Sequence, residues 1–166
     1  PVTHAIGDRA IDIVLDAIEK ALKERPDPDH RMSIEHCSLP TEAAVDRIKR
    51  LGVLPSSSVG FIYELGPAHF LGLGPERIKR YFPHKTYLKK SILAVGNSDW
   101  YVTSGEIAQQ LYSVVTRKAY TGERIGPDQA ISVKEALRLY TTNGAYASFE
   151  EDIKGSIEPG KLADMV

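Results

Sequence analysis

Residues 91–99, Ser-Ile-Leu-Ala-Val-Gly-Asn-Ser-Asp, contain the stretch that decides the fold class. The apolar run Ile92–Val95 is too short for a core helix and stops at Gly96, so it predicts a strand buried on both faces. The chain then turns and presents a carboxylate, Asp99. A carboxylate just beyond the C-terminal end of a buried parallel strand lies where α/β barrels carry their chemistry.

Two further predicted strands end in side chains that can bind a metal. The stretch 2–4 ends in His4, and the stretch 31–36 ends in His36. Three strand ends therefore offer two imidazoles and one carboxylate. This is a ligand set for zinc or a similar ion, and the carboxylate can also act as a base. A lone histidine at a strand end can equally be a hydrogen-bonded structural residue, and Asp99 can be a helix cap.

Predicted helices alternate with the predicted strands along the chain. The pattern predicts strands at 2–4, 31–36, 53–59 and 92–95, a long loop at 60–74, and helices at 8–23, 41–51, 75–81, 85–90, 104–118 and 132–141. This alternation predicts a parallel α/β sheet with right-handed crossovers. Four strands are half of an eight-stranded barrel, since a whole barrel needs roughly 250 residues.

Short local signals mark the ends of several helices. Asp8 is placed to cap the first helix, and Thr41 lies where the second begins. Gly52 follows the second helix as a C-terminal glycine. Ser132 with Glu135 forms a capping-box pattern at the start of the last one.

Composition excludes several functional classes. The 166 residues suffice for one domain, and 21 Lys and Arg against 22 Asp and Glu leave a net charge of −1. This balance predicts no nucleic-acid partner and no membrane contact. The single cysteine, Cys37, cannot form an internal disulfide, so we expect a cytoplasmic protein.

Five motifs occur in a fixed order along the chain: HAIGDRA at 4–10, SIEHC at 33–37, GNSD at 96–99, EALRLYT at 135–141 and GSIEPGKLAD at 155–164. Together they resemble the amidohydrolase superfamily, and within it amidohydrolase family 3, the N-substituted formamide deformylase-like metal-dependent hydrolases. The resemblance covers essentially the whole chain. It implies a (β/α)8 TIM barrel with a small β-sandwich, and hydrolysis of amide-type C–N bonds in a small molecule.

The resemblance also assigns roles and boundaries. It implies that 1–154 form the C-terminal half of the barrel, strands five to eight, and that 155–166 begin a truncated β-sandwich segment. His4, His36 and Asp99 are implied as ligands of a divalent metal, zinc being the expected ion. Asp99 would also take the proton from the metal-bound water.

The sequence lacks part of the family pattern. The His-x-His pair of strand one and the strand-four ligand have no counterpart here. The chain opens without methionine inside a predicted strand and stops inside another, so both ends are interpreted as cut from a longer protein. The full-length enzyme is expected to hold one or two ions, and this chain to hold metal weakly or not at all. An alternative is a catalytically inactive module that acts only in self-association. The open sheet predicts a homo-oligomer, a dimer, or completion by a missing N-terminal half.

Four further features have an expected role. Glu35 alternates with His36, so we expect it to point away from the barrel interior and form a structural salt bridge. Cys37 either fits a tight strand end or supplies a redox-sensitive thiol. His69, on the predicted loop, is a candidate substrate contact. Aromatic residues on the same loop either line a pocket or pack the loop down: Phe61, Tyr63 and Phe70.

Overall fold

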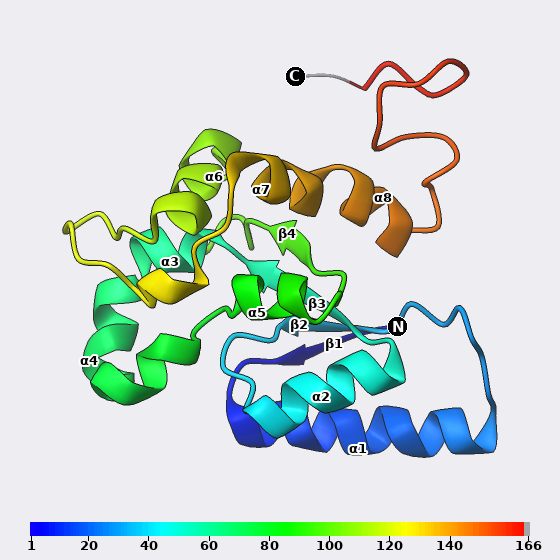
Figure 1. The fold of residues 1–166 in the computed structure, drawn as a ribbon, viewed down its shortest axis with the longest axis horizontal. Coiled ribbons are helices and arrows are strands. Elements are labelled where there is room, and N and C mark those ends of the chain that lie inside the picture. The colour runs from blue at the N-terminus through cyan, green and yellow to red at the C-terminus, as the bar shows by residue number, and fades with distance from the viewer. Residues whose placement is uncertain (165–166) are drawn as a thin grey trace.

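One parallel sheet organises the structure. A computed structural model describes residues 1–164 of the chain. Its strands are β1 (Val2–Ala5), β2 (Ser33–His36), β3 (Leu54–Ser58) and β4 (Val95–Asn97). They lie in the order β1-β2-β3-β4, and every neighbouring pair is parallel (Figure 1). The predicted parallel α/β fold is confirmed.

Helices fill the connections between the strands. α1 (Asp8–Glu24) joins β1 to β2, and α2 (Glu42–Leu51) joins β2 to β3. The connection from β3 to β4 contains α3 (Gly60–Glu64), α4 (Gly66–Arg77), the 3-10 turn η1 (Ile78–Arg80) and α5 (His84–Lys89). After β4 come α6 (Ile107–Thr116), the 3-10 turn η2 (Pro127–Gln129), α7 (Val133–Tyr140) and α8 (Thr142–Ala147). Across residues 1–164, no helix has the length and apolar character needed to cross a membrane.

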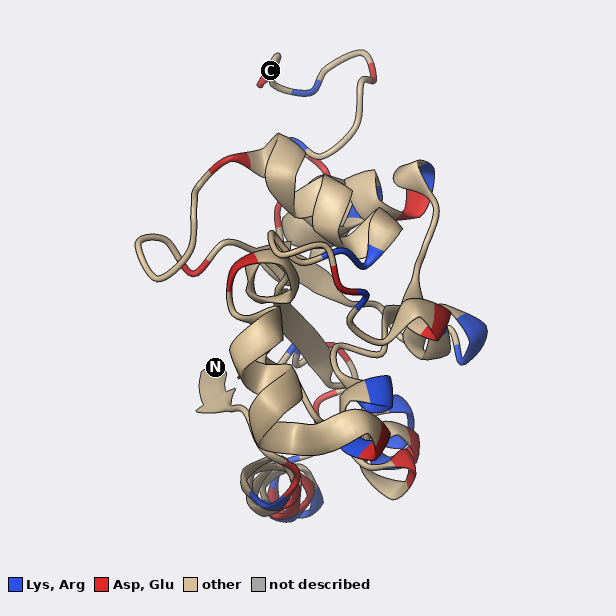
Figure 2. Ribbon diagram, turned by 90° about the vertical axis from the view of Figure 1, so that its left-hand side faces the viewer, with Lys and Arg blue, Asp and Glu red and all other residues tan. Residues whose placement is uncertain are grey.

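The core lies between the sheet and its helices. α1 and α2 lie together on one side of the sheet (Figure 1) and bury Leu15 and Ile48 against Ile34 of β2, all three fully enclosed. Both helices contain basic and acidic residues, coloured blue and red on the ribbon in Figure 2. Near β4, Gly96 lets α7 approach, because a Cβ there would lie 2.8 Å from the ring of Tyr140.

Local end signals were accurate at two of the three helices where they were predicted. The Thr41 side chain accepts a hydrogen bond from the backbone N–H of Ala44, and Gly52 adopts a left-handed φ of +70°. Ser132 and Glu135 form the full capping box. Asp8, in contrast, is the first residue of α1 rather than its cap, and its carboxylate pairs with arginines of the α4–η1 segment.

The prediction of a loop at 60–74 is wrong, because this stretch forms α3 and most of α4. Its glycines suggested chain breaks. Gly66 instead serves close packing, since a Cβ there would come within 2.8 Å of the Ile125 side chain. Gly74 does interrupt the helical geometry, with φ +72° just before Pro75. Tertiary packing therefore decides which glycine breaks a helix and which lies inside one.

The position of the fourth strand also differs from the prediction. β4 begins only at Val95, and its three residues are half-buried rather than enclosed on both faces. Ile92 and Ala94 are buried, but they lead into the strand without pairing in the ladder. Beyond α8, an element the sequence did not predict, residues 155–164 contain turns and no strand. Residues 165 and 166, where the β-sandwich segment was expected to continue, lie outside the described residues.

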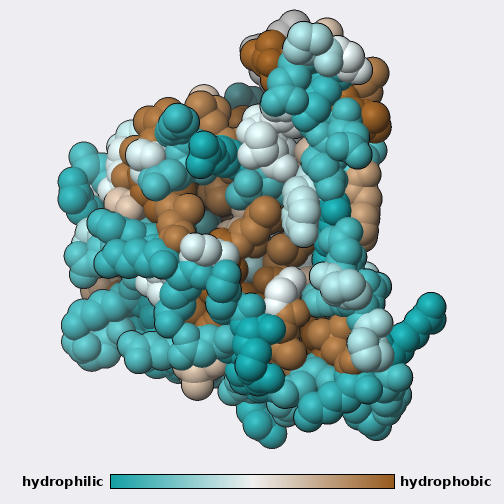
Figure 3. Space-filling model, turned by 45° about the vertical axis from the view of Figure 1, so that its right-hand side comes forward, coloured by the Kyte–Doolittle hydropathy of each residue, from teal (hydrophilic) through white to brown (hydrophobic). Residues whose placement is uncertain are grey.

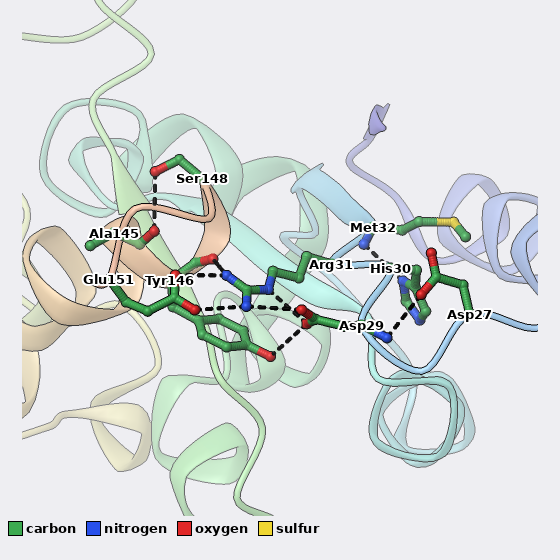
Figure 4. A network of polar contacts seen from close by, with 9 residues as sticks. All are labelled: Asp27, Asp29, His30, Arg31, Met32, Ala145, Tyr146, Ser148 and Glu151. Carbon is green, nitrogen blue, oxygen red and sulfur yellow. Dashed lines mark hydrogen bonds and ion pairs between the residues drawn. The ribbon is translucent and has the colours of Figure 1, made fainter. Parts of the chain in front are cut away.

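An arginine ties the C-terminal helices to the sheet. The Arg31 guanidinium lies 2.7 Å from carboxylate oxygens of both Asp29 and Glu151 (Figure 4). Its central carbon also lies 3.9 Å from the ring centroid of Tyr146 and 4.0 Å from that of Phe149. Ion pairs and cation–π contacts together therefore hold α8 and the segment after it against the start of β2.

His84 predicts an acid sensitivity of the fold. It is 1% exposed, and neither ring nitrogen has a hydrogen-bond partner among residues 1–164. Burial, and then the charge of Arg117, lowers the pKa of His84 to about 3. Its pKa in the unfolded chain is about 6.5, so between these values only the unfolded state binds the extra proton. Stability therefore falls as pH falls, by about 1.4 kcal/mol per pH unit.

Urea unfolding at pH 7 and pH 5 measures this effect. The parent is expected to lose about 2 kcal/mol more stability between these pH values than the His84→Phe variant does. The phenyl ring keeps the stacking with Phe82 but cannot bind a proton. Equal losses in parent and variant would show that His84 does not set the acid limit.

Candidate functional site

Two of the three predicted ligands meet at the ends of adjacent strands. His4 lies in β1 and His36 ends β2. The Nδ1 atom of His4 and the Nε2 atom of His36 are 3.1 Å apart, and the two rings meet edge-on. The pair is open on one side, because His4 is exposed while His36 is only 4% exposed.

A row of polar side chains continues from this pair across the same face of the sheet. The register places His4 beside Glu35 and Glu35 beside Ser56, and it pairs Ser58 with Asn97 one pleat further on. Residues paired across parallel strands, and those two apart along a strand, share a face. Hydrogen bonds join them: Asn97 Nδ2 donates to Glu35 Oε1 at 2.6 Å, and Ser58 Oγ donates to Asn97 Oδ1 at 2.9 Å.

The expected orientation of Glu35 is therefore wrong. It faces the same side as His4 and accepts hydrogen bonds from Asn97 and Ser56, and no salt bridge to it is found within residues 1–164. Strand alternation fails at the next residue because His36 has φ +68° and Cys37 has φ +45°. These left-handed conformations end the regular strand and bring the His36 side chain back to the face of Glu35.

The environment of His36 favours the neutral ring. Burial lowers the pKa of His36, and the neighbouring His4 acts in the same direction, while Glu35 and Asp99 oppose the shift. Neutral imidazole is the form that binds a metal. The adjacent Cys37 fits the tight strand end, fully buried, and burial raises its pKa to about 12. Its thiol is therefore protonated and not a reactive group.

Asp99 lies in the turn after β4, two residues beyond the strand. It is half-buried with φ +50°, and its backbone carbonyl accepts the N–H of Val102 at 2.7 Å. Thr103 fixes the turn against the start of α3, where a Cβ on Gly60 would clash with the threonine hydroxyl. Asp99 is close enough to influence the pKa of His36. Within residues 1–164, however, no three His, Cys, Asp or Glu side chains gather closely enough to hold a metal.

His69 lies near the histidine pair but does not contact it. The Phe61 ring stacks on His36 with a centroid distance of 5.4 Å, and the His69 ring follows at 6.2 Å from Phe61. The Nδ1 atom of His69 lies 2.5 Å from the buried hydroxyl of Tyr81. Phe61 is thus packed between two histidines, while Tyr63 packs on other tyrosines and Phe70 stays partly exposed.

Sequence reasoning missed the polar residues behind the histidine pair. Ser58 bonds His36 directly, Asn97 accepts from Ser58, and Ser56 accepts from Asn97. None of the three was assigned a role from the sequence. A signal was present, since serines at 56 and 58 recur at the two-residue period of one strand face. Asn97 lies within the GNSD motif, two residues before Asp99.

Comparisons with known proteins place these features in context. The model of the amidohydrolase family matches residues 1–166. The chain is 32% identical over 165 residues to N-substituted formamide deformylase of Arthrobacter pascens, covering 98% of this chain and 30% of that protein. It is 31% identical to putative amidohydrolase YtcJ of Bacillus subtilis, and the match covers 97% of this chain and 30% of that protein.

Solved structures give the same picture. An uncharacterized metal-dependent hydrolase from Pyrococcus horikoshii superposes with a TM-score of 0.80 at 28% identity, over 98% of this chain and 32% of that one. An uncharacterized metal-dependent hydrolase from Pyrococcus furiosus superposes with a TM-score of 0.78 at 30% identity. The match covers 98% of this chain and 31% of that one. The chain thus spans about a third of the length of the proteins it matches.

Proposed function

Because the chain belongs to the amidohydrolase family, we propose that it supplies two metal ligands and the general base of a metal-dependent hydrolase acting on amide-type C–N bonds. The main support for this proposal is that His4 Nδ1 and His36 Nε2 lie 3.1 Å apart at the ends of adjacent parallel strands. On this proposal, residues 1–154 are the C-terminal half of a TIM barrel. The similarity to N-substituted formamide deformylase favours a small amide-type substrate.

The donor set fits a divalent metal. Imidazole nitrogen is a usual zinc ligand, and two such nitrogens face each other here. A catalytic zinc has three protein ligands and an open position, so this pair is an incomplete set. Asp99 is the proposed third ligand of this chain, and ligands from outside it would complete the site. A bound divalent ion would lower the pKa of its water and polarise the substrate carbonyl.

In this proposal a residue of this chain accepts and donates the proton. Asp99 accepts the proton of the attacking water on a carboxylate oxygen and returns it to the leaving nitrogen. Its turn is held by backbone hydrogen bonds and by the contact of Thr103 with Gly60, which fixes the backbone that carries the carboxylate. His69 is the proposed substrate contact. The Tyr81 hydroxyl orients the His69 ring through a hydrogen bond, and burial lowers the pKa of His69 below its usual value.

Zinc binding by the histidine pair is a direct test. Excess zinc is expected to raise the melting temperature of the chain, because a ligand that binds only the folded state stabilises it by mass action. His36→Ala is expected to abolish that increase, since one of the two facing nitrogens is lost. Differential scanning calorimetry with and without zinc measures both effects.

His30→Ala is the matched control for this test. His30 bonds the backbone of Leu51 and Met32, away from the pair, so its loss should leave the zinc response intact. A His36→Ala variant that responds to zinc like the parent would exclude His36 as a ligand.

Self-association stays a prediction. β1 and β4 are the edges of the sheet, and Val2 in β1 is 67% exposed. Figure 3 shows apolar side chains in a hollow in the middle of one face, bordered by hydrophilic residues. The face of the sheet that carries the histidine pair is polar near the strand ends, because Glu35, Ser56 and Asn97 lie there. Any partner must therefore satisfy polar groups as well as cover apolar surface.

A further inference from the structure

The position of a hydrogen on His36 follows from the hydrogen bonds behind it. Glu35 Oε1 is a carboxylate oxygen, and it lies 2.6 Å from one side-chain terminus of Asn97. That terminus must be the amide nitrogen, because the carboxylate accepts and an amide oxygen facing it would repel it. The same nitrogen gives its second hydrogen to Ser56 Oγ at 3.0 Å. The Asn97 amide therefore has a single orientation, with Oδ1 directed to Ser58.

The orientation of Asn97 in turn determines the role of Ser58. Oδ1 can only accept, so the one hydroxyl hydrogen of Ser58 points to it across 2.9 Å. Ser58 Oγ then has only lone pairs left for His36 Nδ1, which lies 2.8 Å away. Nδ1 must therefore carry the ring hydrogen. In a neutral imidazole this leaves a lone pair on Nε2, which accepts a hydrogen bond from His4 Nδ1 at 3.1 Å.

We infer that Glu35, Asn97 and Ser58 are positioning residues, a hydrogen-bond relay that fixes the Nδ1–H tautomer and the ring orientation of His36 and so prepares its Nε2 atom as a metal ligand. The inference rests on the proposed function. Metal-binding histidines are generally held through their second nitrogen in this way. The relay spans β2, β3 and β4, so the sheet register itself sets the state of the ring.

Nitrogen NMR of the imidazole rings tests the relay without metal or substrate. In the parent chain, long-range hydrogen–nitrogen spectra are expected to show His36 with its hydrogen on Nδ1. Ser58→Ala removes the acceptor and should release this tautomer. Asn97→Ala should do the same indirectly, because the Ser58 hydrogen is then free to turn toward Nδ1. Ser58→Thr keeps a hydroxyl at the same position and should retain the parental spectrum.

Zinc affinity, measured by competition with a chelator, is the second readout. Ser58→Ala is expected to weaken zinc binding by about 10–100-fold, whereas Ser58→Thr should bind like the parent. A parent ring with its hydrogen on Nε2, or an unchanged tautomer in Ser58→Ala, would overturn the relay. The parent spectrum decides this even if a variant fails to fold. If the parent binds no zinc while its tautomer is as expected, the relay stands and the proposed metal site fails.

Discussion

Replacing Arg117 with methionine is expected to lower the free energy of unfolding by about 4 kcal/mol, since each buried acceptor left unsatisfied costs about 1–3 kcal/mol. Arg117 is fully buried. Its guanidinium donates to three backbone carbonyls, those of Ile125 at 2.7 Å, Tyr81 at 2.6 Å and Phe82 at 3.2 Å. Methionine fills much of the same volume but donates no hydrogen bond, so the carbonyls lose their partner.

This arginine fastens α6 to the segment before α5. Burial lowers the pKa of Arg117 to about 9, which still leaves it charged at neutral pH. Chemical unfolding of parent and variant measures the effect. Arg124→Met is the matched control, because Arg124 is exposed seven residues further on and should change stability by less than about 0.5 kcal/mol. A similar small change for Arg117→Met would mean that the three carbonyls find other partners.

Replacing Asp99 with asparagine is expected to lower turnover by a factor of about 10²–10⁴ in the protein that carries this chain, because a positioned general base contributes that much. Asparagine has the same shape and, like aspartate, tolerates the left-handed conformation found here, φ +50°. It cannot accept the proton of the attacking water. The fold should therefore survive while the chemical step slows.

Steady-state kinetics with a small formamide or amide substrate, together with thermal unfolding, separate these effects. Asp46→Asn is the control, an exposed carboxylate on α2 that pairs with Lys90. It should leave turnover unchanged. Near-parental turnover in Asp99→Asn, with an intact fold, would remove Asp99 from the proposed proton transfer and leave its predicted role as a ligand to be tested by zinc binding.

The parts of the candidate site that could be predicted are metal-binding side chains at the ends of predicted strands. His4 and His36 end predicted strands, and adjacent parallel strands bring such ends together, so their contact could be expected from the sequence. Asp99 was placed beyond the correct strand, although the strand itself begins three residues later than expected. Ser58 and Asn97 were not predicted, because their roles depend on the register between strands, which no local pattern reveals.

What the sequence determined by itself was the order of elements and several of their ends. Alternating apolar runs and helical periodicity predicted a parallel α/β sheet, and Ser132 with Glu135 marked a helix start, because these signals act between residues close in the chain. Tertiary structure alone decided the face of Glu35, the helices at 60–77 and the burial of Arg117. Each depends on partners on other elements: the left-handed turn at His36, the packing of Ile125 on Gly66, and three carbonyls brought together by folding.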